Sequence, residues 1–348
     1  MKSRKPVYIL TILFFASFAI IGIQAFISKK LIDKKNGFNR RLLSSALTPQ
    51  KDITLPVKLT KLIGRQNGIL YFQEDKPYEI YSTNQNLDSV QTIKLPIAPD
   101  KDLGRNIYMF MKDQLIYIAC RNMPGFLIYD LSSGSLDYHT VKNYYNQEAI
   151  FSPDEFIVRA KDYKTQSHRF IKFNLQQKDS MREDHFSDRK IIGGFKTAGA
   201  LYYDTATQQA CYTYLYQNGF ICMDTSLNLT LKARTIDTVT NREIKVARVG
   251  SSLTMKQPPQ EINDIGDVFA GRLFLQSMLK ADNEYELDFA ENSVVDIYNL
   301  RTGAYAGSFY IPAYKGQKAL HFKVIDNKLY ALYGKTIVLY DLGFIEGL

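Results

Sequence analysis

A short pattern that recurs six times constrains the fold of this chain more than any other feature. An apolar strand ends in an aromatic or large apolar residue, a small polar residue follows, and a turn comes next. The six polar residues are Ser82, Asp130, Asn174, Asp224, Asn299 and Asp341. Their spacings are 48, 44, 50, 75 and 42 residues, and four of the five fit a four-stranded propeller blade.

A second strand precedes each of these positions, as in 69–72 and 329–332, and a third often follows, as in 92–96. The 24 Tyr and 21 Phe favour strands, and no helical periodicity is found beyond the apolar N-terminal run. Such units bury one another when they are arranged radially. A β-sandwich does not explain six units with a shared marker, and a solenoid needs shorter periods.

The last blade lacks an outer strand in sequence order, because the chain ends seven residues after Asp341. The segment Ile53-Thr54-Leu55-Pro56 is similar to 93–96 and 309–312, which hold outer-strand positions and also end in Pro. A Pro is tolerated there because an outer strand has a free edge. We therefore expect residues 52–57 to close the ring by pairing with the last blade.

With strands such as Ile128-Tyr129-Asp130-Leu131 followed by Gly134, the chain resembles six-bladed β-propellers of the TolB-like kind over residues 52–348. The resemblance implies an all-β fold, with the propeller domain at 51–348, and implies no activity. The chain has no Trp, so the Trp docking repeats of some propeller families are absent. The 75-residue interval predicts an insertion at about 238–263.

Residues 7–27 are an uncharged apolar run preceded by a short basic tail, 1–6. As a helix it spans about 31 Å, enough to cross the hydrocarbon core of a bilayer. A secretory signal and a buried core helix are the alternatives. We expect a retained signal anchor, because the run exceeds a signal core of about 7–15 residues, has no clean small-x-small pair at its end, and has no Cys close behind it.

Residues 28–50 are predicted to be a basic tether, whose cations could also contact anionic lipid headgroups. Three cations precede the apolar run and six follow it, so the positive-inside count places the propeller in the cytoplasm. Long domains are often translocated regardless of such charges. We therefore expect the domain to be extracytoplasmic, either periplasmic or at the cell surface.

The positive charge of the chain lies on its N-terminal segment. Of the formal net charge of +9, residues 1–50 carry +8 and the other 298 residues carry +1. A nucleic-acid-binding protein needs its cations on the folded domain. The sequence therefore predicts no nucleic-acid partner.

No catalytic, cofactor-binding or metal-binding residue is predicted. His139, His168, His185 and His321 lack metal-ligand spacing, and no G-x-S-x-G, P-loop or G-x-G-x-x-G follows a strand. Gly193-Gly194 indicates a turn. The acids Asp282, Glu284, Glu286, Asp288 and Glu291 lack the Gly of a calcium loop and are expected to form a solvated hairpin between the second and third strands of blade five.

The insertion contains Gln257-Pro258-Pro259-Gln260, a stiff loop that could carry binding. Cys211 and Cys222 flank an expected two-residue turn at Asn218-Gly219. That turn sets Cys222 opposite Leu215, with Cys211 about 13 Å away along the strand. We therefore expect no disulfide, and free thiols for these two residues and Cys120.

Two functions remain open at this stage. The first is a membrane-anchored binding or scaffold module for a protein, peptide or glycan. The second is a propeller enzyme, a hydrolase or quinone-type oxidoreductase, with its site in the axial funnel. Converging acids, His and Arg at the axis would favour the enzyme, and apolar or small residues would favour the module.

Overall fold

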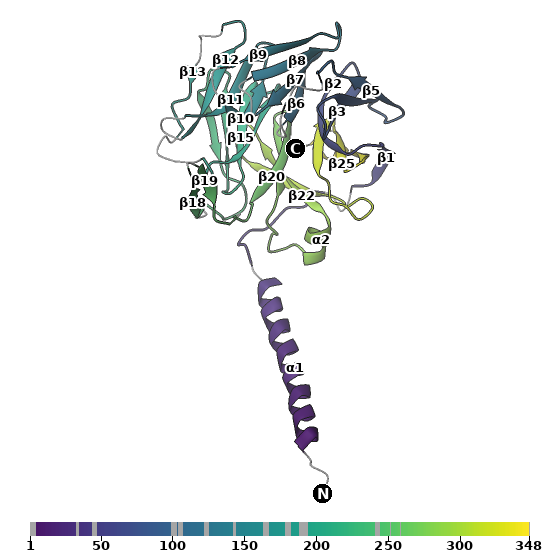
Figure 1. The fold of residues 1–348 in the computed structure, drawn as a ribbon, viewed down its shortest axis with the longest axis vertical. Helices are drawn as coiled ribbons and strands as arrows, with labels where there is room; N and C mark the ends of the chain where they lie inside the picture. Colours follow the sequence, from purple (N-terminus) through teal and green to yellow (C-terminus); the bar gives the residue numbers. More distant parts are fainter. Residues whose placement is uncertain are drawn as a thin grey trace.

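The computed structural model is a ring of six four-stranded antiparallel sheets with one long helix at its edge (Figure 1). The helix, α1, runs from Lys5 to Ile32. The structure describes residues 5–32, 35–43, 47–98, 103, 107–121, 125–141, 144–162, 167–177, 182–187, 194–240, 244–250, 252–257 and 259–347. Gly193 and Pro258 lie outside these ranges.

Each blade is a meander whose first strand lies next to the axis. Blade one is β2 (Leu59–Gln66), β3 (Ile69–Glu74), β4 (Glu79–Asn84) and β5 (Val90–Lys94). Blade two is β6 (Ile107–Lys112), β7 (Leu115–Cys120), β8 (Gly125–Asp130) and β9 (Leu136–Thr140). Blade three is β10 (Tyr145–Ile150), β11 (Glu155–Lys161), β12 (His168–Asn174) and β13 (Arg182–Glu183).

Blade four is β14 (Gly199–Asp204), β15 (Gln209–Tyr214), β16 (Phe220–Asp224) and β17 (Leu229–Ala233). Blade five is β20 (Asn263–Phe269), β21 (Arg272–Ser277), β22 (Ser293–Asn299) and β23 (Tyr305–Ile311). Blade six is β24 (His321–Ile325), β25 (Lys328–Tyr333), β26 (Thr336–Asp341) and, from the other end of the chain, β1 (Pro49–Thr54). A 3-10 turn, η1 (Gly343–Ile345), follows blade six.

The recurring polar residue ends the third strand of each blade and makes the turn behind it. Its side-chain Oδ1 accepts a hydrogen bond from the backbone N–H two residues later, which is the contact that favours Asp and Asn in turns. These acceptors are Asn84, Asp130, Asn174, Asp224, Asn299 and Asp341, at 2.7–3.1 Å. In blade one the equivalent residue is Asn84, two positions after the expected Ser82.

Each interface between neighbouring blades contains a cluster of buried apolar side chains, including the interface between blades six and one. In that last cluster Ile325, Leu332 and Ile337 of blade six meet Leu59 and Phe72 of blade one. Every sheet therefore has both faces covered, as a closed ring requires.

The prediction that an N-terminal strand closes the last blade is confirmed, with different bounds. β1 pairs antiparallel with β26, and Ile53 lies opposite Ile337. The strand ends at Thr54, so Leu55 and Pro56 follow it. Leu55 is instead buried in the interface of blades six and one, with its N–H bonded to the Lys335 carbonyl at 2.8 Å. Pro96 and Pro312 also follow their strands directly or after one residue.

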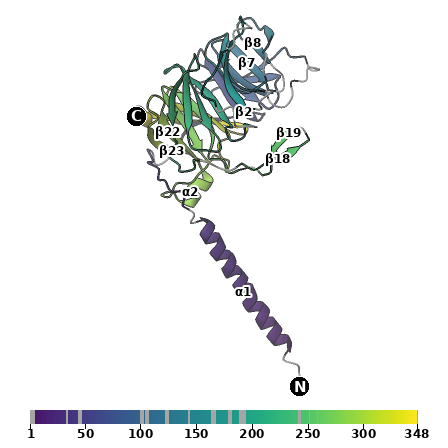
Figure 2. The same ribbon diagram turned by 90° about the vertical axis from the view of Figure 1, so that its left-hand side faces the viewer.

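The alternating strand directions divide the loops between two faces of the ring. The loops between the second and third strands, and the connections from one blade to the next, lie on one face, called the connecting face below. The insertion is a separate hairpin on that face, β18 (Val246–Val249) with β19 (Ser252–Met255), which projects from the ring (Figure 2). A short helix, α2 (Glu286–Glu291), lies between β21 and β22.

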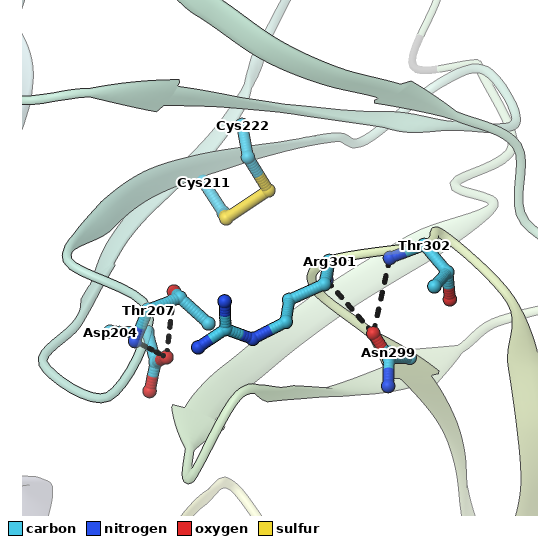
Figure 3. The surroundings of a disulfide bond; sticks show 7 residues. All are labelled: Asp204, Thr207, Cys211, Cys222, Asn299, Arg301 and Thr302. Atoms are coloured by element: carbon cyan, nitrogen blue, oxygen red, sulfur yellow. Dashed lines mark hydrogen bonds between the residues drawn. A yellow bond between two sulfur atoms is a disulfide. The ribbon is translucent and has the colours of Figure 1, made fainter.

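The prediction of free thiols at Cys211 and Cys222 is wrong. The two residues are directly opposite in β15 and β16 and form a disulfide within the interface of blades four and five (Figure 3). Figure 3 shows Arg301 of blade five extended across this interface toward the turn of Asp204 and Thr207 in blade four.

The expected two-residue turn does not form because its flanking residues bind elsewhere. The last pair of the ladder is Thr213 with Phe220, so residues 214–219 lie between the two paired positions. The Leu215 N–H bonds the Ala198 carbonyl at 2.8 Å, and the Asn218 N–H bonds the Val239 carbonyl at 2.8 Å. These contacts open the hairpin and shift its register, which brings the cysteines together.

We expect the disulfide to protect these two thiols from alkylation. In denaturant without a reducing agent only Cys120, which is buried and not part of the disulfide, should be labelled, and all three should be labelled after reduction. Replacing both residues by Ser should lower the free energy of unfolding by about 2–3 kcal/mol, because the closed loop is short. Labelling of three thiols without reduction would contradict this pairing.

Closure of the ring can be tested by shortening the chain. A protein that starts at Leu47 keeps β1, whereas one that starts at Lys58 loses that strand and the burial of Leu55. We expect the shorter protein to be less stable by about 3 kcal/mol or more in urea unfolding.

The same interface can be tested in the complete chain, where Leu55→Ala should cost about 2–5 kcal/mol. Replacing the half-exposed Val90 of β5 by Ala is the matched control, and it should have little effect. Equal losses in the two variants would argue against closure at Leu55.

Candidate functional site

Charged and polar side chains from all six blades gather around the axis of the ring. They lie on the inner strands or, in blade two, just behind the second strand. In blade order they are Lys61 of β2, Arg121 after β7, Glu148 of β10, Tyr202 of β14, Asp267 of β20, and Lys323 with His321 of β24. This set is called the axial cluster below.

Both carboxylates that act on Lys61 are paired with a cation. Arg121 donates two hydrogen bonds to Glu148, from Nη2 to Oε1 at 2.8 Å and from Nε to Oε2 at 3.2 Å. Lys323 Nζ lies 2.9 Å from Asp267 Oδ1, and the Val324 N–H donates to Oδ2 at 2.8 Å. Glu148 and Asp267 are buried, so these pairs fix the two carboxylates in place.

Lys61 is the cation of the cluster that lacks such a partner. Within the described part of the chain no carboxylate lies within ion-pair distance of its Nζ, which instead sits over the Phe110 ring, 5.2 Å from the centroid. Burial lowers the pKa of Lys61 to about 8. The positive charges of Lys323 and Arg121 also lower this pKa, whereas the carboxylates of Glu148 and Asp267 raise it. Its ammonium group therefore makes no direct ion pair with the described residues.

His321 lies close enough to Lys61 and Lys323 for their charges to affect its pKa. Burial lowers its pKa well below the usual value, and the charges of Lys61 and Lys323 lower it further, so the imidazole is neutral at pH 7. Its Nδ1 is buried and makes no hydrogen bond to the described residues. The neutral ring can therefore offer one hydrogen bond beside the two ammonium groups.

The phenol of Tyr202 and a third carboxylate, that of Asp264, lie beside Asp267. Burial, and then the charge of Asp267, raise the pKa of Tyr202, so its hydroxyl stays protonated. Burial raises the pKa of Asp264, and the charge of Asp264 adds to the raised pKa of Tyr202. The charges that act most on Lys61 are those of Lys323, Arg121, Glu148 and Asp267, so with Lys61 itself three cations stand against two carboxylates, and this local excess of positive charge can hold an anionic group.

The sequence alone assigned no residue to the axial funnel. One signal was present, since Lys61 directly precedes the apolar pair Leu62-Ile63 in β2 and Lys323 stands between Phe322 and Val324 in β24. Whether such residues face the axis depends on β-bulges, and bulges occur in β2, β10 and β20. A bulge changes which side chains face inward, so alternation along the strand does not identify them.

The four histidines do not come together. His168 begins β12, where burial, Arg159 and Lys161 lower its pKa to about 3. His139 lies in β9 and His185 follows β13. Across the residues that the structure describes, no group of three or more His, Cys, Asp or Glu side chains is placed to hold a metal ion.

The prediction of a solvated acidic hairpin is wrong for two of the five acids. Both residues contact residues 36–43, called the arm below, so Glu284 is buried and Asp282 is hydrogen-bonded. Asp282 accepts the Asn36 N–H at 2.7 Å and the Gly37 N–H at 3.1 Å. The other three acids lie in α2, which has no buried residue.

Arg40 is the centre of the arm. Its guanidinium is buried and binds Asp296 through Nε at 2.8 Å, the Leu279 carbonyl at 3.0 Å and the Glu284 carboxylate. Burial alone would lower the pKa of Arg40, but the charges of Asp296 and Glu284 outweigh it and raise that pKa. The backbone of the arm continues along β23, where Leu43 N–H bonds the Ser308 carbonyl at 2.8 Å.

Residues 28–50 were expected from the sequence to form a tether. In the structure α1 continues to Ile32, and the arm is bound to blade five from Asn36 onward. Only three residues, 33–35, separate the helix from the arm.

The fold resembles several solved propellers, although no protein-family model and no curated protein matches the chain. A member of the DUF4221 family from Bacteroides vulgatus aligns over 88% of this chain and 98% of its own, with a TM-score of 0.54 and 13% identity. The WD40 domain of Neurospora crassa Pan2 covers 87% and 98%, with a TM-score of 0.51 and 8% identity. At these identities the similarity shows the propeller fold alone.

Removing the arginine at the centre of the arm should destabilise the protein. Arg40→Ala leaves two carboxylates buried without a cation, so we expect a loss of about 3–5 kcal/mol in urea unfolding. Arg41 is the matched control, because it is adjacent and exposed. Arg41→Ala removes one hydrogen-bonded side chain at the surface and should cost about 1 kcal/mol. Similar losses in both variants would show that the buried Arg40 does not stabilise the protein more than the exposed Arg41 does.

Proposed function

We propose that this protein is a membrane-anchored, extracytoplasmic β-propeller that binds a small anionic ligand at its axis. The observation that carries the proposal is Lys61, a half-buried cation without an acid partner in a cluster whose carboxylates are both paired. A carboxylate, sulfate or phosphate group beside Lys61 would gain from Lys323 and Arg121 as well. On the pattern of its blade strands, we also propose that the propeller is of the TolB-like kind.

Two features support the location. α1 holds an uncharged window, Tyr8–Ala25, with a mean hydropathy of 2.1 and no residue buried against the ring, which suits a membrane span. The disulfide between Cys211 and Cys222 suits an oxidising compartment such as the periplasm or the cell surface. A disulfide opposes the cytoplasmic placement that the positive-inside count alone would give.

The enzyme alternative is supported less well by the same cluster. Acids, His and Arg do converge on the axis, which was the expectation for an enzyme. However, Glu148 and Asp267 are each engaged by a cation, and this leaves neither as a free general base. The geometry thus favours binding of an anion over a hydrolytic reaction.

Anion binding can be measured with sulfate, phosphate and glucuronate as probes in titration calorimetry. Lys61→Met should weaken the binding of the preferred anion by about tenfold or more, the cost of one charge-assisted hydrogen bond. The variant should still fold, because Glu148 and Asp267 keep their partners. Lys58, exposed just before the same strand, provides the matched control, and Lys58→Met should bind normally.

Sulfate is the best probe for pH dependence, because its charge does not change between pH 6 and 9. Lys61 is protonated below its pKa of about 8. Sulfate affinity should therefore fall as the pH rises through about 8, and Lys61→Met should abolish this dependence. Failure of all three anions to bind the unaltered protein, or equal binding by both lysine variants, would refute the proposed site.

A further inference from the structure

We infer that the loop of blade five between β21 and β22, residues 278–292, rests on the membrane that α1 spans. The partner proposed for this loop is the boundary between the lipid headgroups and the acyl chains. The inference depends on the anchoring part of the proposed function and is independent of the axial ligand.

The length of chain between helix and ring brings the loop to the membrane. Seven helical residues follow the apolar window that ends at Ala25, and they extend about 10 Å, which crosses the headgroup region. From Ile32 to Asn36 the chain spans at most about 14 Å even when it is fully extended. Asn36 must therefore lie close to the bilayer surface.

The arm fixes the loop to that point. Asn36 binds both ends of the loop segment 280–282. Its Nδ2 donates a hydrogen bond to the Lys280 carbonyl at 2.8 Å, and its backbone N–H donates one to Asp282 at 2.7 Å. Phe38 packs on Leu279 and Ala281, and Asn283 exchanges two hydrogen bonds with the backbone of Arg40, each at 2.9 Å. In Figures 1 and 2 α2 is the part of the ring nearest to the end of α1.

Two side chains of the loop, Tyr285 and Leu287, are of the kind that a membrane interface accepts, and they stand beside the exposed acids Asp288 and Glu291 of α2. Tyr285 is 80% exposed and Leu287 is 70% exposed, the highest values for large apolar side chains of the ring among the described residues. Tyr is enriched at the level of the headgroups, and a Leu beside it can enter the acyl boundary. The acid Glu286 between them is paired with Lys280 at 2.9 Å, which lessens its repulsion from phosphate groups.

The complete protein in vesicles of phosphatidylcholine provides the test. Cys120 is buried and the other two cysteines are paired, so Leu287→Cys introduces one thiol that can be labelled with an environment-sensitive dye. Ser133→Cys, in the exposed turn between β8 and β9 on the opposite blade, is the matched control. Both positions are exposed, so both variants should fold.

The label at 287 should emit at shorter wavelength, lose emission to spin-labelled lipid, and be protected from aqueous iodide. The label at 133 should show the reverse. Equal iodide quenching at the two positions, in protein that resists extraction by alkaline carbonate, would overturn the inference and leave the anchor intact. Release of the protein by carbonate would overturn the inference together with the anchor, and sulfate binding would then test the axial site separately.

Discussion

The structure depends on the contact between blade six and blade one, because a ring of sheets is stable only when the last interface is filled like the others. Ile325, Leu332 and Ile337 reach Leu59 and Phe72 there, and β1 covers the edge of β26. Without that contact two sheets would each expose an apolar face, and β26 would present an open edge. The five other interfaces repeat the same packing, so the ring distributes one kind of interaction evenly around its axis.

The polar residue behind each third strand explains why so much of this fold could be predicted from the sequence. Its role is local, since Asp or Asn closes a turn with its own backbone, and local interactions leave a signal in a short window. The two-residue error at Ser82 has the same origin, because the true turn former in blade one, Asn84, stands two positions later. The Asn218-Gly219 signal failed for the opposite reason. Distant partners, Ala198 and Val239, decide where that hairpin opens.

The axial cluster and the arm could not be predicted from the sequence for a related reason, because their contacts join residues that are far apart in the chain. Lys61, Glu148 and Asp267 are far apart in sequence, and three bulged strands determine which side chains face inward. Arg40 stood in a run of basic residues, where a solvated cation is the ordinary expectation. Its burial follows only from Glu284 and Asp296, which are more than 240 residues away. Charge that is compensated by distant partners has no local pattern to reveal it.

The pairing of the first strand with the last also sets the order in which this protein can be completed. Thr54 and Thr336 touch although 282 positions separate them, so one half of the closing pair exists long before the other half is synthesised. Blades one to five can form as the chain grows, but the flank of blade one stays uncovered until the final strand arrives. A premature stop within the last blade would therefore leave an open, aggregation-prone arc with two exposed flanks, and its five intact sheets would not yield a smaller working ring.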